Sequence, residues 1–127
     1  MGILIDENTR VLVQGITGGE GVRATQAMLE YGTNVVAGVT PGKGGQEVEG
    51  VPVFDTISEA LEAYPEINTS LIYVPPFAAR DAAFESMSND IKLINCITEG
   101  IPIRDSTEIV AYAKSKNVTF VGPSSVG

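Results

Sequence analysis

The sequence predicts an α/β domain built on an open, parallel β-sheet, and three observations support this fold class. Five apolar, β-prone runs recur along the chain, at residues 11–16, 35–39, 70–74, 93–97 and 118–121. The runs are continuous rather than alternating, which is typical of strands covered by helices on both faces. Helical patterns fill the intervals, and right-handed crossovers join parallel strands at such spacings. We therefore expect a Rossmann-like, doubly wound parallel five-stranded sheet, in strand order 3-2-1-4-5, within a single domain.

Four helices are expected between these strands, and the first two show apolar residues at helical spacing. The pattern i, i+3, i+4, i+7 occurs at Ala24, Ala27, Met28 and Tyr31 and again at Ile57, Ala60, Leu61 and Tyr64. Gly32 supplies a C-terminal stop for the first helix. Thr56 and Glu59 form a capping box ahead of the second helix, and Pro65 ends it.

The third and fourth helices have recognisable ends. The third is expected to begin near residues 75–77. Its inward positions are expected to be Ala83, Phe84 and Met87. The fourth is expected to begin at Asp105 and to finish on Lys114 and Lys116, whose charges suit the negative end of the helix dipole.

One connection, residues 40–55, has little helical periodicity and is long for a loop inside a compact domain. Loops of this length are usually functional or mobile. The alternative is a surface excursion with a small β-bridge at residues 51–54.

Length, charge and cysteine content limit the class of protein. The chain has 127 residues, of which 43% are hydrophobic, and this fits one compact soluble domain. Its net charge of −8 argues against a general nucleic-acid or anionic-membrane surface. No apolar stretch approaches the ~20 residues of a membrane helix, and the N-terminus lacks a basic n-region. The lone cysteine, Cys96, and the absence of histidine predict no disulfide, no metal site and a cytoplasmic location.

A glycine-rich loop, "GITGGEGV" at residues 15–22, directly follows the first predicted strand. It places free backbone amides at a helix N-terminus, where the helix dipole favours an anion. Its four glycines permit positive φ and a close approach of a ligand, and Thr17 adds a hydroxyl donor. The loop therefore predicts a phosphate site, with a tight strand–helix turn as the structural alternative.

The end of the second predicted strand narrows the choice of phosphate ligand. The spacing of the first loop is G-x-x-G-x-x-G, and no acidic residue follows the second strand to hold a ribose diol, as NAD requires. Instead Lys43 stands among Gly42, Gly44 and Gly45. A cation on pliant backbone there suits a ligand with an additional phosphate near the adenosine ribose, so NADP and coenzyme A (CoA) both qualify. A solvated surface lysine is the alternative, and a P-loop is excluded because no G-K-[ST] follows the glycines.

Several strings, taken together, carry a family resemblance over nearly the whole chain, from Ile3 to Gly127. They are "QGITGGEG", "YGTNVVAGVTPGKGGQ", "GVPVFDT", "IYVPPFAARDA", "ITEGIP" and "VGPSS". In this order they resemble the N-terminal CoA-binding domain of the α subunit of succinyl-CoA synthetase (succinate–CoA ligase). The strings "TPGKGG" and "ITEGIP" are specific, whereas the glycine loop is much less so.

The resemblance implies CoA-binding positions at the carboxyl ends of the strands and no catalytic residue in this chain. Those beside the phosphates would be Thr17, Gly18, Gly19, Glu20 and Lys43; those beside the adenine would be Val74 and Pro75; those along the pantetheine would be Ile97, Thr98 and Glu99.

In that family the complete ADP- or GDP-forming enzyme makes succinyl-CoA when the CoA thiol attacks succinyl phosphate. It uses a phosphorylated histidine in a second α-subunit domain, and a β subunit that binds Mg-nucleotide and succinate. This chain has no histidine. The resemblance therefore implies that residues 1–127 are a CoA-binding domain whose partner is the β subunit. It also implies that this chain lacks the phosphohistidine domain and is inactive alone. Both a fragment of a longer α subunit and a naturally short relative fit the sequence.

The chain departs from the family pattern at two places. The family commonly has Gln where Glu20 stands, and an acid there would repel phosphates unless it points outward. The family commonly ends the last strand with "GPNCPG", whereas "GPSSVG" places Ser124 and Ser125 near the thiol. These serines have no histidine to activate them.

Four other residues receive structural interpretations. Cys96 sits in an apolar strand and is predicted to be a buried packing thiol. Tyr73 and Phe77 are predicted to pack, although stacking on an adenine stays open. Glu99 fits a role near the thiol, a helix cap and a pair with Arg104 equally well.

Two functions from other classes compete with the ligase domain. One is a stand-alone, non-catalytic CoA-binding regulatory module. The other is an NADP-binding domain, which predicts tight NADPH binding and no preference for CoA over NADPH.

Overall fold

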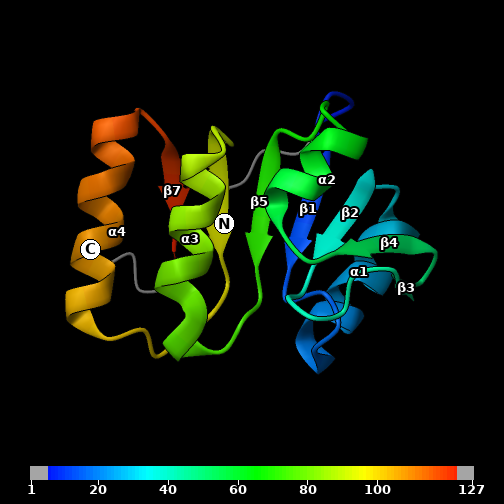
Figure 1. Ribbon diagram of the computed structural model, residues 1–127, viewed down its shortest axis with the longest axis horizontal. Helices are drawn as coiled ribbons and strands as arrows, with labels where there is room; N and C mark the ends of the chain where they lie inside the picture. Colours follow the sequence, from blue (N-terminus) through cyan, green and yellow to red (C-terminus); the bar gives the residue numbers. More distant parts are fainter. Residues whose placement is uncertain (1–5, 123–127) are drawn as a thin grey trace.

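Seven strands form one sheet in the order β3-β4-β2-β1-β5-β6-β7 in the computed structural model, which describes residues 6–122 (Figure 1). Their bounds are β1 Val11–Gln14, β2 Val35–Val39, β3 Glu47–Val48, β4 Val51–Phe54, β5 Thr69–Ile72, β6 Leu93–Cys96 and β7 Thr119–Val121. All neighbouring pairs are parallel except β3 with β4, which pair antiparallel at one edge. The predicted α/β class with a parallel sheet is confirmed.

The predicted strand order 3-2-1-4-5 is wrong, because one parallel strand was missing from it. Residues 51–54 form β4, which pairs with β2 through Gly38 and Val53, rather than a small bridge on a surface loop. β4 occupies the place beside β2 that the prediction gave to residues 70–74. β5 instead lies on the other side of β1, with Leu12 opposite Ser70.

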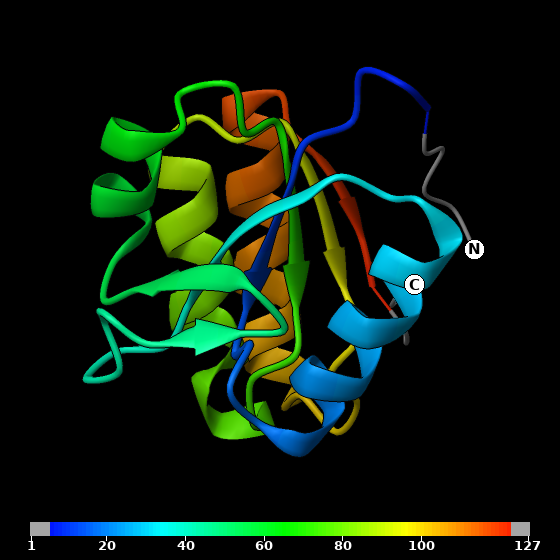
Figure 2. The same cartoon turned by 90° about the vertical axis from the view of Figure 1, so that its right-hand side faces the viewer.

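Helices cover the sheet unequally. Their bounds are α1 Gly19–Tyr31, α2 Ile57–Ala63, α3 Ala79–Ser88 and α4 Ile103–Lys116, with a 3-10 turn, η1, at Pro76–Ala78. Figure 2 shows α2, α3 and α4 on one side of the sheet and α1 on the other. Within residues 6–122, α1 is the only helix on its side and it packs on β1 and β2. The expectation that helices cover both faces of every strand is therefore too broad.

The predicted inward face of helix α1 is only partly confirmed: Met28 is half-buried against the core, but two of the other predicted positions are not. Gly21 and Thr25 are its buried residues, whereas Ala27 is exposed and Tyr31 is 86% exposed. Thr25 satisfies its own hydroxyl by donating to the Gly21 carbonyl at 2.8 Å. The apolar spacing identified the buried face only in part, because this helix approaches the sheet mainly through small residues. Gly32 ends α1 in the left-handed conformation, as predicted.

The remaining helices agree well with expectation. Thr56 caps α2 by accepting a hydrogen bond from the Glu59 amide at 3.1 Å. In α3, Ala83 and Met87 are fully buried. α4 begins at Ile103, two residues before the predicted start. No helix within residues 6–122 is long and apolar enough to cross a bilayer.

A buried polar cluster fixes α3 to the sheet just beneath its carboxyl edge. The Gln14 Oε1 atom accepts hydrogen bonds from the hydroxyls of Ser70 at 2.6 Å and Ser86 at 2.7 Å. Its Nε2 atom donates to the Ala82 carbonyl at 2.9 Å. The amide oxygen and nitrogen of Gln14 and the hydroxyls of Ser70 and Ser86 are thus all hydrogen-bonded in an otherwise apolar core. These bonds fix the positions of β1, β5 and α3 relative to one another. The starting points of the loops after β1 and β5 are therefore fixed relative to each other as well.

Candidate functional site

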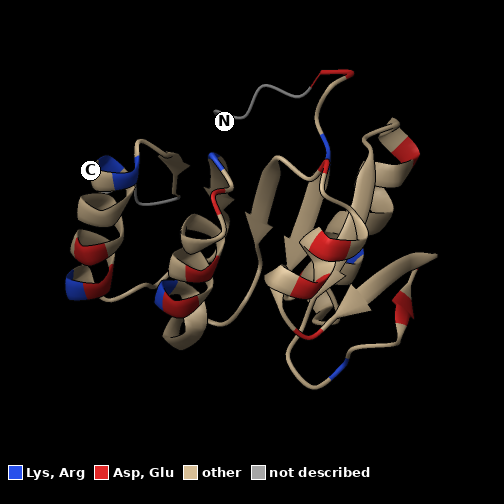
Figure 3. Cartoon of the chain, turned by 45° about the horizontal axis from the view of Figure 1, so that its top comes forward, with Lys and Arg blue, Asp and Glu red and all other residues tan. Residues whose placement is uncertain are grey.

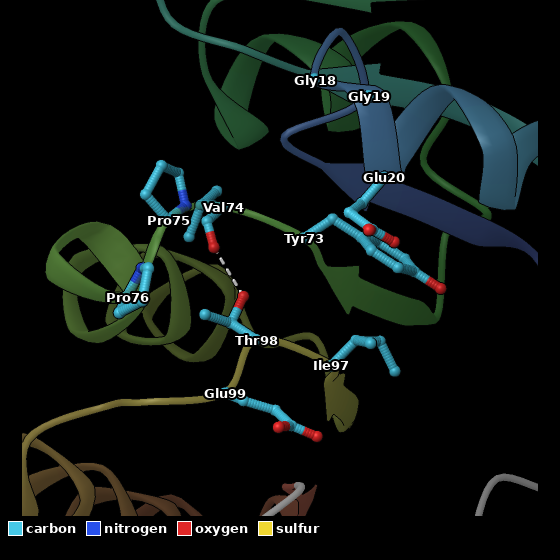
Figure 4. Close-up of a pocket in the computed structure, with 10 residues that line it drawn as sticks. All are labelled: Gly18, Gly19, Glu20, Tyr73, Val74, Pro75, Pro76, Ile97, Thr98 and Glu99. Atoms are coloured by element: carbon cyan, nitrogen blue, oxygen red, sulfur yellow. Dashed lines mark hydrogen bonds between the residues drawn. The ribbon is translucent and has the colours of Figure 1, made fainter.

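A cavity of about 590 Å³ lies at the carboxyl ends of β1, β5 and β6. Three loops form its walls (Figure 4), and its lining residues are Gly18, Gly19, Glu20, Tyr73, Val74, Pro75, Pro76, Ile97, Thr98 and Glu99. Ligands of open α/β sheets bind at this edge. Of the residues predicted from the sequence, only Thr17 and Lys43 are outside the lining.

The glycine loop forms the first wall. Gly15 has a φ of 82°, and a Cβ placed there would lie 2.9 Å from the Tyr73 carbonyl carbon, so the chain passes close to the end of β5. The other glycines of the loop do not use positive φ. Gly18 is the N-cap of α1 and provides no side-chain cap, so the first helical turn begins at the cavity wall without a side-chain capping partner.

Thr17 joins the glycine loop to the next loop instead of lining the cavity. Its Oγ1 atom lies 3.1 Å from the Oγ1 atom of Thr40, and its amide donates to the same oxygen at 3.4 Å. The hydroxyl that the sequence offered as a phosphate donor is therefore engaged with Thr40. This contact couples the loop after β1 to the loop after β2.

Glu20 lies in the cavity wall and has a basic partner. Its Oε2 atom is 3.0 Å from the Nη2 atom of Arg23, three residues along α1. The two side chains are 76% and 68% exposed, so water screens the pair, but the acid at this position is locally compensated. Glu20 also lies beside Tyr73 (Figure 4). Burial, and secondarily the Glu20 carboxylate, raise the pKa of Tyr73, which keeps the phenol neutral.

The opposite wall consists of the loops after β5 and β6. The Thr98 hydroxyl donates to the Val74 carbonyl at 2.6 Å and connects the two loops, as the dashed line in Figure 4 marks. Glu99 makes no ion pair within residues 6–122, so it is not paired with Arg104 there. It does not cap α4 either, because the N-cap is Pro102 and has no side-chain hydrogen bond.

Lys43 lies in the exposed loop between β2 and β3, at the same edge of the sheet but outside the cavity wall. It is the basic segment visible in that loop in Figure 3. Within residues 6–122 its ammonium group has no ion pair. Its charge is therefore free for an anionic ligand.

Two lining residues, Tyr73 and Pro76, were missing from the predicted set. The sequence predicts Tyr73 to pack and leaves a contact with the ligand open, and in the structure Tyr73 lines the cavity. Pro76 directly follows two predicted positions, so continuity along the strand end is the signal that identifies it. The packing interpretation of Phe77 is wrong, because that side chain is 83% exposed. Ser124 and Ser125 lie outside the described residues.

Cys96 is a packing residue, as predicted, and we expect it to be unreactive in the native protein. It is 1% exposed on β6, and burial raises the pKa of its thiol, so little thiolate forms near neutral pH. Ellman's reagent at pH 8 should modify it at least about tenfold faster in denaturant than in buffer. Equal rates in the two conditions would contradict this burial.

Comparison with known proteins places the chain in a family. The family model for the CoA binding domain matches residues 6–100. The chain is 52% identical over 128 residues to succinate–CoA ligase [ADP-forming] subunit alpha 2 of Archaeoglobus fulgidus, covering 100% of this chain and 44% of that protein. It is also 52% identical to the corresponding alpha subunit of Methanothermobacter thermautotrophicus, covering 98% of this chain and 42% of that protein.

A solved structure resembles the chain as well. ATP citrate lyase from Methanothrix soehngenii, solved with citrate and coenzyme A, superposes with a TM-score of 0.82 at 26% identity, over 95% of this chain and 21% of that chain. The chain thus spans less than half the length of the curated relatives it matches. The match to the family model covers most of the chain and includes two of the three loops that wall the cavity and part of the third. The chain belongs to the CoA-binding domain family.

Proposed function

We propose that residues 1–127 act as a CoA-binding domain that holds CoA at the carboxyl edge of the sheet. The observation that carries this proposal is the cavity between the uncapped N-terminus of α1 and the loops after β5 and β6. Its volume of about 590 Å³ falls in the range of small-molecule sites. Family membership and a structurally similar protein solved with coenzyme A support the same ligand.

The chemistry of the walls fits different parts of CoA. The first-turn amides of Gly19 and Glu20 suit the diphosphate, since they are donors at the positive end of a helix dipole. Lys43 suits the phosphate on the adenosine ribose. The mainly apolar segments at Val74–Pro75 and Ile97–Thr98 suit the adenine and the pantetheine. The role of this chain would be to orient the thiol rather than to exchange protons with it.

The larger protein that fits this domain is the α subunit of an ADP- or GDP-forming succinate–CoA ligase. Identity of 52% to two such α subunits supports this assignment. In that enzyme the catalytic histidine would lie in a second domain, a β subunit would be the partner and would hold Mg-nucleotide, and the location would be the cytoplasm. A coding sequence that continues past Gly127, or a neighbouring gene for a nucleotide-binding β subunit, would favour this over a stand-alone CoA-responsive module.

Calorimetric titration with CoA, dephospho-CoA and NADPH tests the ligand. We expect CoA to bind, dephospho-CoA to bind at least about fivefold more weakly, and NADPH to give little heat, because the cavity would hold the pantetheine as well as the phosphates. Binding of NADPH without binding of CoA would identify an NADP-binding domain instead. Absence of heat from all three ligands would contradict the proposed function for this chain.

A further inference from the structure

The loop that carries Lys43 is attached to a carboxylate that lies beyond the β3–β4 hairpin, 11 to 13 residues along the chain. Asp55 directly follows β4, and its Oδ1 atom accepts hydrogen bonds from the amides of Gly42 at 2.8 Å and Gly44 at 3.0 Å. These two amides flank Lys43 in the chain. A single carboxylate oxygen therefore binds the backbone immediately before and immediately after the lysine, in both cases at a glycine.

Two further observations show that the backbone here is fixed rather than pliant, as the sequence had suggested. A Cβ on Gly44 would lie 2.8 Å from the Asp55 Oδ2 atom, so the carboxylate rests directly against the glycine backbone. The loop is also joined to β4 by the Thr40 amide, which donates to the Phe54 carbonyl at 3.1 Å, and by the Gly45 amide, which donates to the Val53 carbonyl at 3.0 Å. Both ends of the loop are thus anchored.

The position of Asp55 also determines which group of the loop is left for a ligand. Successive backbone amides in a glycine-rich turn can themselves bind a phosphate. The amides of Gly42 and Gly44 already bind Asp55, so they are not available. The ammonium of Lys43 has no ion pair within residues 6–122 and is the free cationic group of the loop.

We infer that Asp55 is a positioning residue, which holds the loop so that Lys43 is presented to the ribose phosphate of the ligand. This inference rests on the proposed CoA-binding function and adds a specificity-determining residue to it. Asp55 itself does not touch the ligand, and its carboxylate acts through the backbone on either side of Lys43.

Two variants separate this role from a simple effect of charge. Asp55→Ala removes the acceptor oxygen and the negative charge, whereas Asp55→Asn removes the charge but keeps Oδ1 as an acceptor. In the unliganded protein, we expect hydrogen exchange of the Gly42 and Gly44 amides, followed by NMR, to accelerate at least tenfold in Asp55→Ala and less than threefold in Asp55→Asn. Melting temperature monitors the fold of both variants.

The ligand readout is the ratio of the dissociation constants for dephospho-CoA and CoA. It should fall at least threefold in Asp55→Ala and stay within twofold of wild type in Asp55→Asn. If the two variants behave alike in exchange and in ratio, or if Asp55→Ala keeps the wild-type ratio, the positioning role is wrong while CoA binding stands. If the wild type binds no CoA, the proposed function fails and this role fails with it, whatever the exchange rates.

Discussion

Gly21→Ala should lower the free energy of unfolding by about 3 kcal/mol or more, because the new methyl group has no space. A Cβ at this position would lie 2.2 Å from the Gly15 carbonyl oxygen and 2.9 Å from the Ile16 Cα atom. Both neighbours are backbone atoms at the point where β1 turns into α1, so relief requires the helix to move away from the sheet. A domain with marginal stability would lose much of it, and thermal denaturation should show a fall of about 10 °C or more.

Gly19→Ala is the matched control within the same helical turn. The nearest atom to a Cβ on Gly19 is the Arg23 Nη1 atom at 3.8 Å, an ordinary contact with a flexible side chain. We expect its stability to stay within about 0.5 kcal/mol of wild type, since alanine is also the better helix former. Its affinity for CoA should nevertheless fall about tenfold, because a methyl group would separate the phosphates from the first-turn amides.

The contrast between Gly19→Ala and Gly21→Ala distinguishes a glycine loop that binds the ligand from one that is only a tight turn. A loop that is only a tight turn needs Gly15 and Gly21, which contact other backbone, but has no use for glycine at Gly18 and Gly19, where the Cβ direction is open. Retained stability with lost affinity in Gly19→Ala would assign those positions to the ligand. Unchanged affinity would leave the loop as a turn, and a stable Gly21→Ala protein would contradict the packing of α1 described above.

The sequence predicted the parallel sheet because the strands that form its centre are continuous apolar runs, and such runs are typical of parallel strands that are buried on both faces. It missed β4 because Pro52 lies inside Val51–Phe54 and weakens the strand signal there, although β1, β5 and β6 are no longer than β4. The wrong strand order followed from that omission. It also identified the buried face of α1 only in part, since periodicity counts apolar side chains such as Met28, whereas Gly21 and Thr25 pack by being small.

The candidate site was predicted to the extent that it follows from strand ends. Loops after parallel strands meet at one edge of the sheet, so the sequence alone groups the residues after β1, β5 and β6. The contacts that hold Thr17 and the loop around Lys43 could not be found in this way. Thr40 and Asp55 contact these loops through tertiary structure, and nothing in their local spacing marks them. Arg23 differs from these two residues, because its i,i+3 spacing from Glu20 on a helix is a local signal for their ion pair.

Lys43→Ala should weaken CoA binding about tenfold, by about 1.4 kcal/mol, and leave dephospho-CoA binding within about twofold. The reason is that the exposed ammonium has no ion pair within residues 6–122 to lose, so its removal costs only the contact with the ligand. The difference between the two ligands should also shrink in the wild type as salt is raised, since exposed charges are screened. Titrations at two ionic strengths measure both effects.

The variant Lys114→Ala makes the same change in net charge at the last turn of α4, on an element far along the chain from the loop. If the long-range field of this acidic protein governed affinity, both lysine variants would weaken CoA and dephospho-CoA alike. A local phosphate contact instead predicts that only Lys43→Ala removes the preference for CoA. Because Lys43 stands outside the cavity wall, that preference would extend the site from the cavity to the loop after β2. If Lys43→Ala keeps the preference for CoA, the ligand contacts only the cavity, and Lys43 is a solvated surface residue without a role in binding.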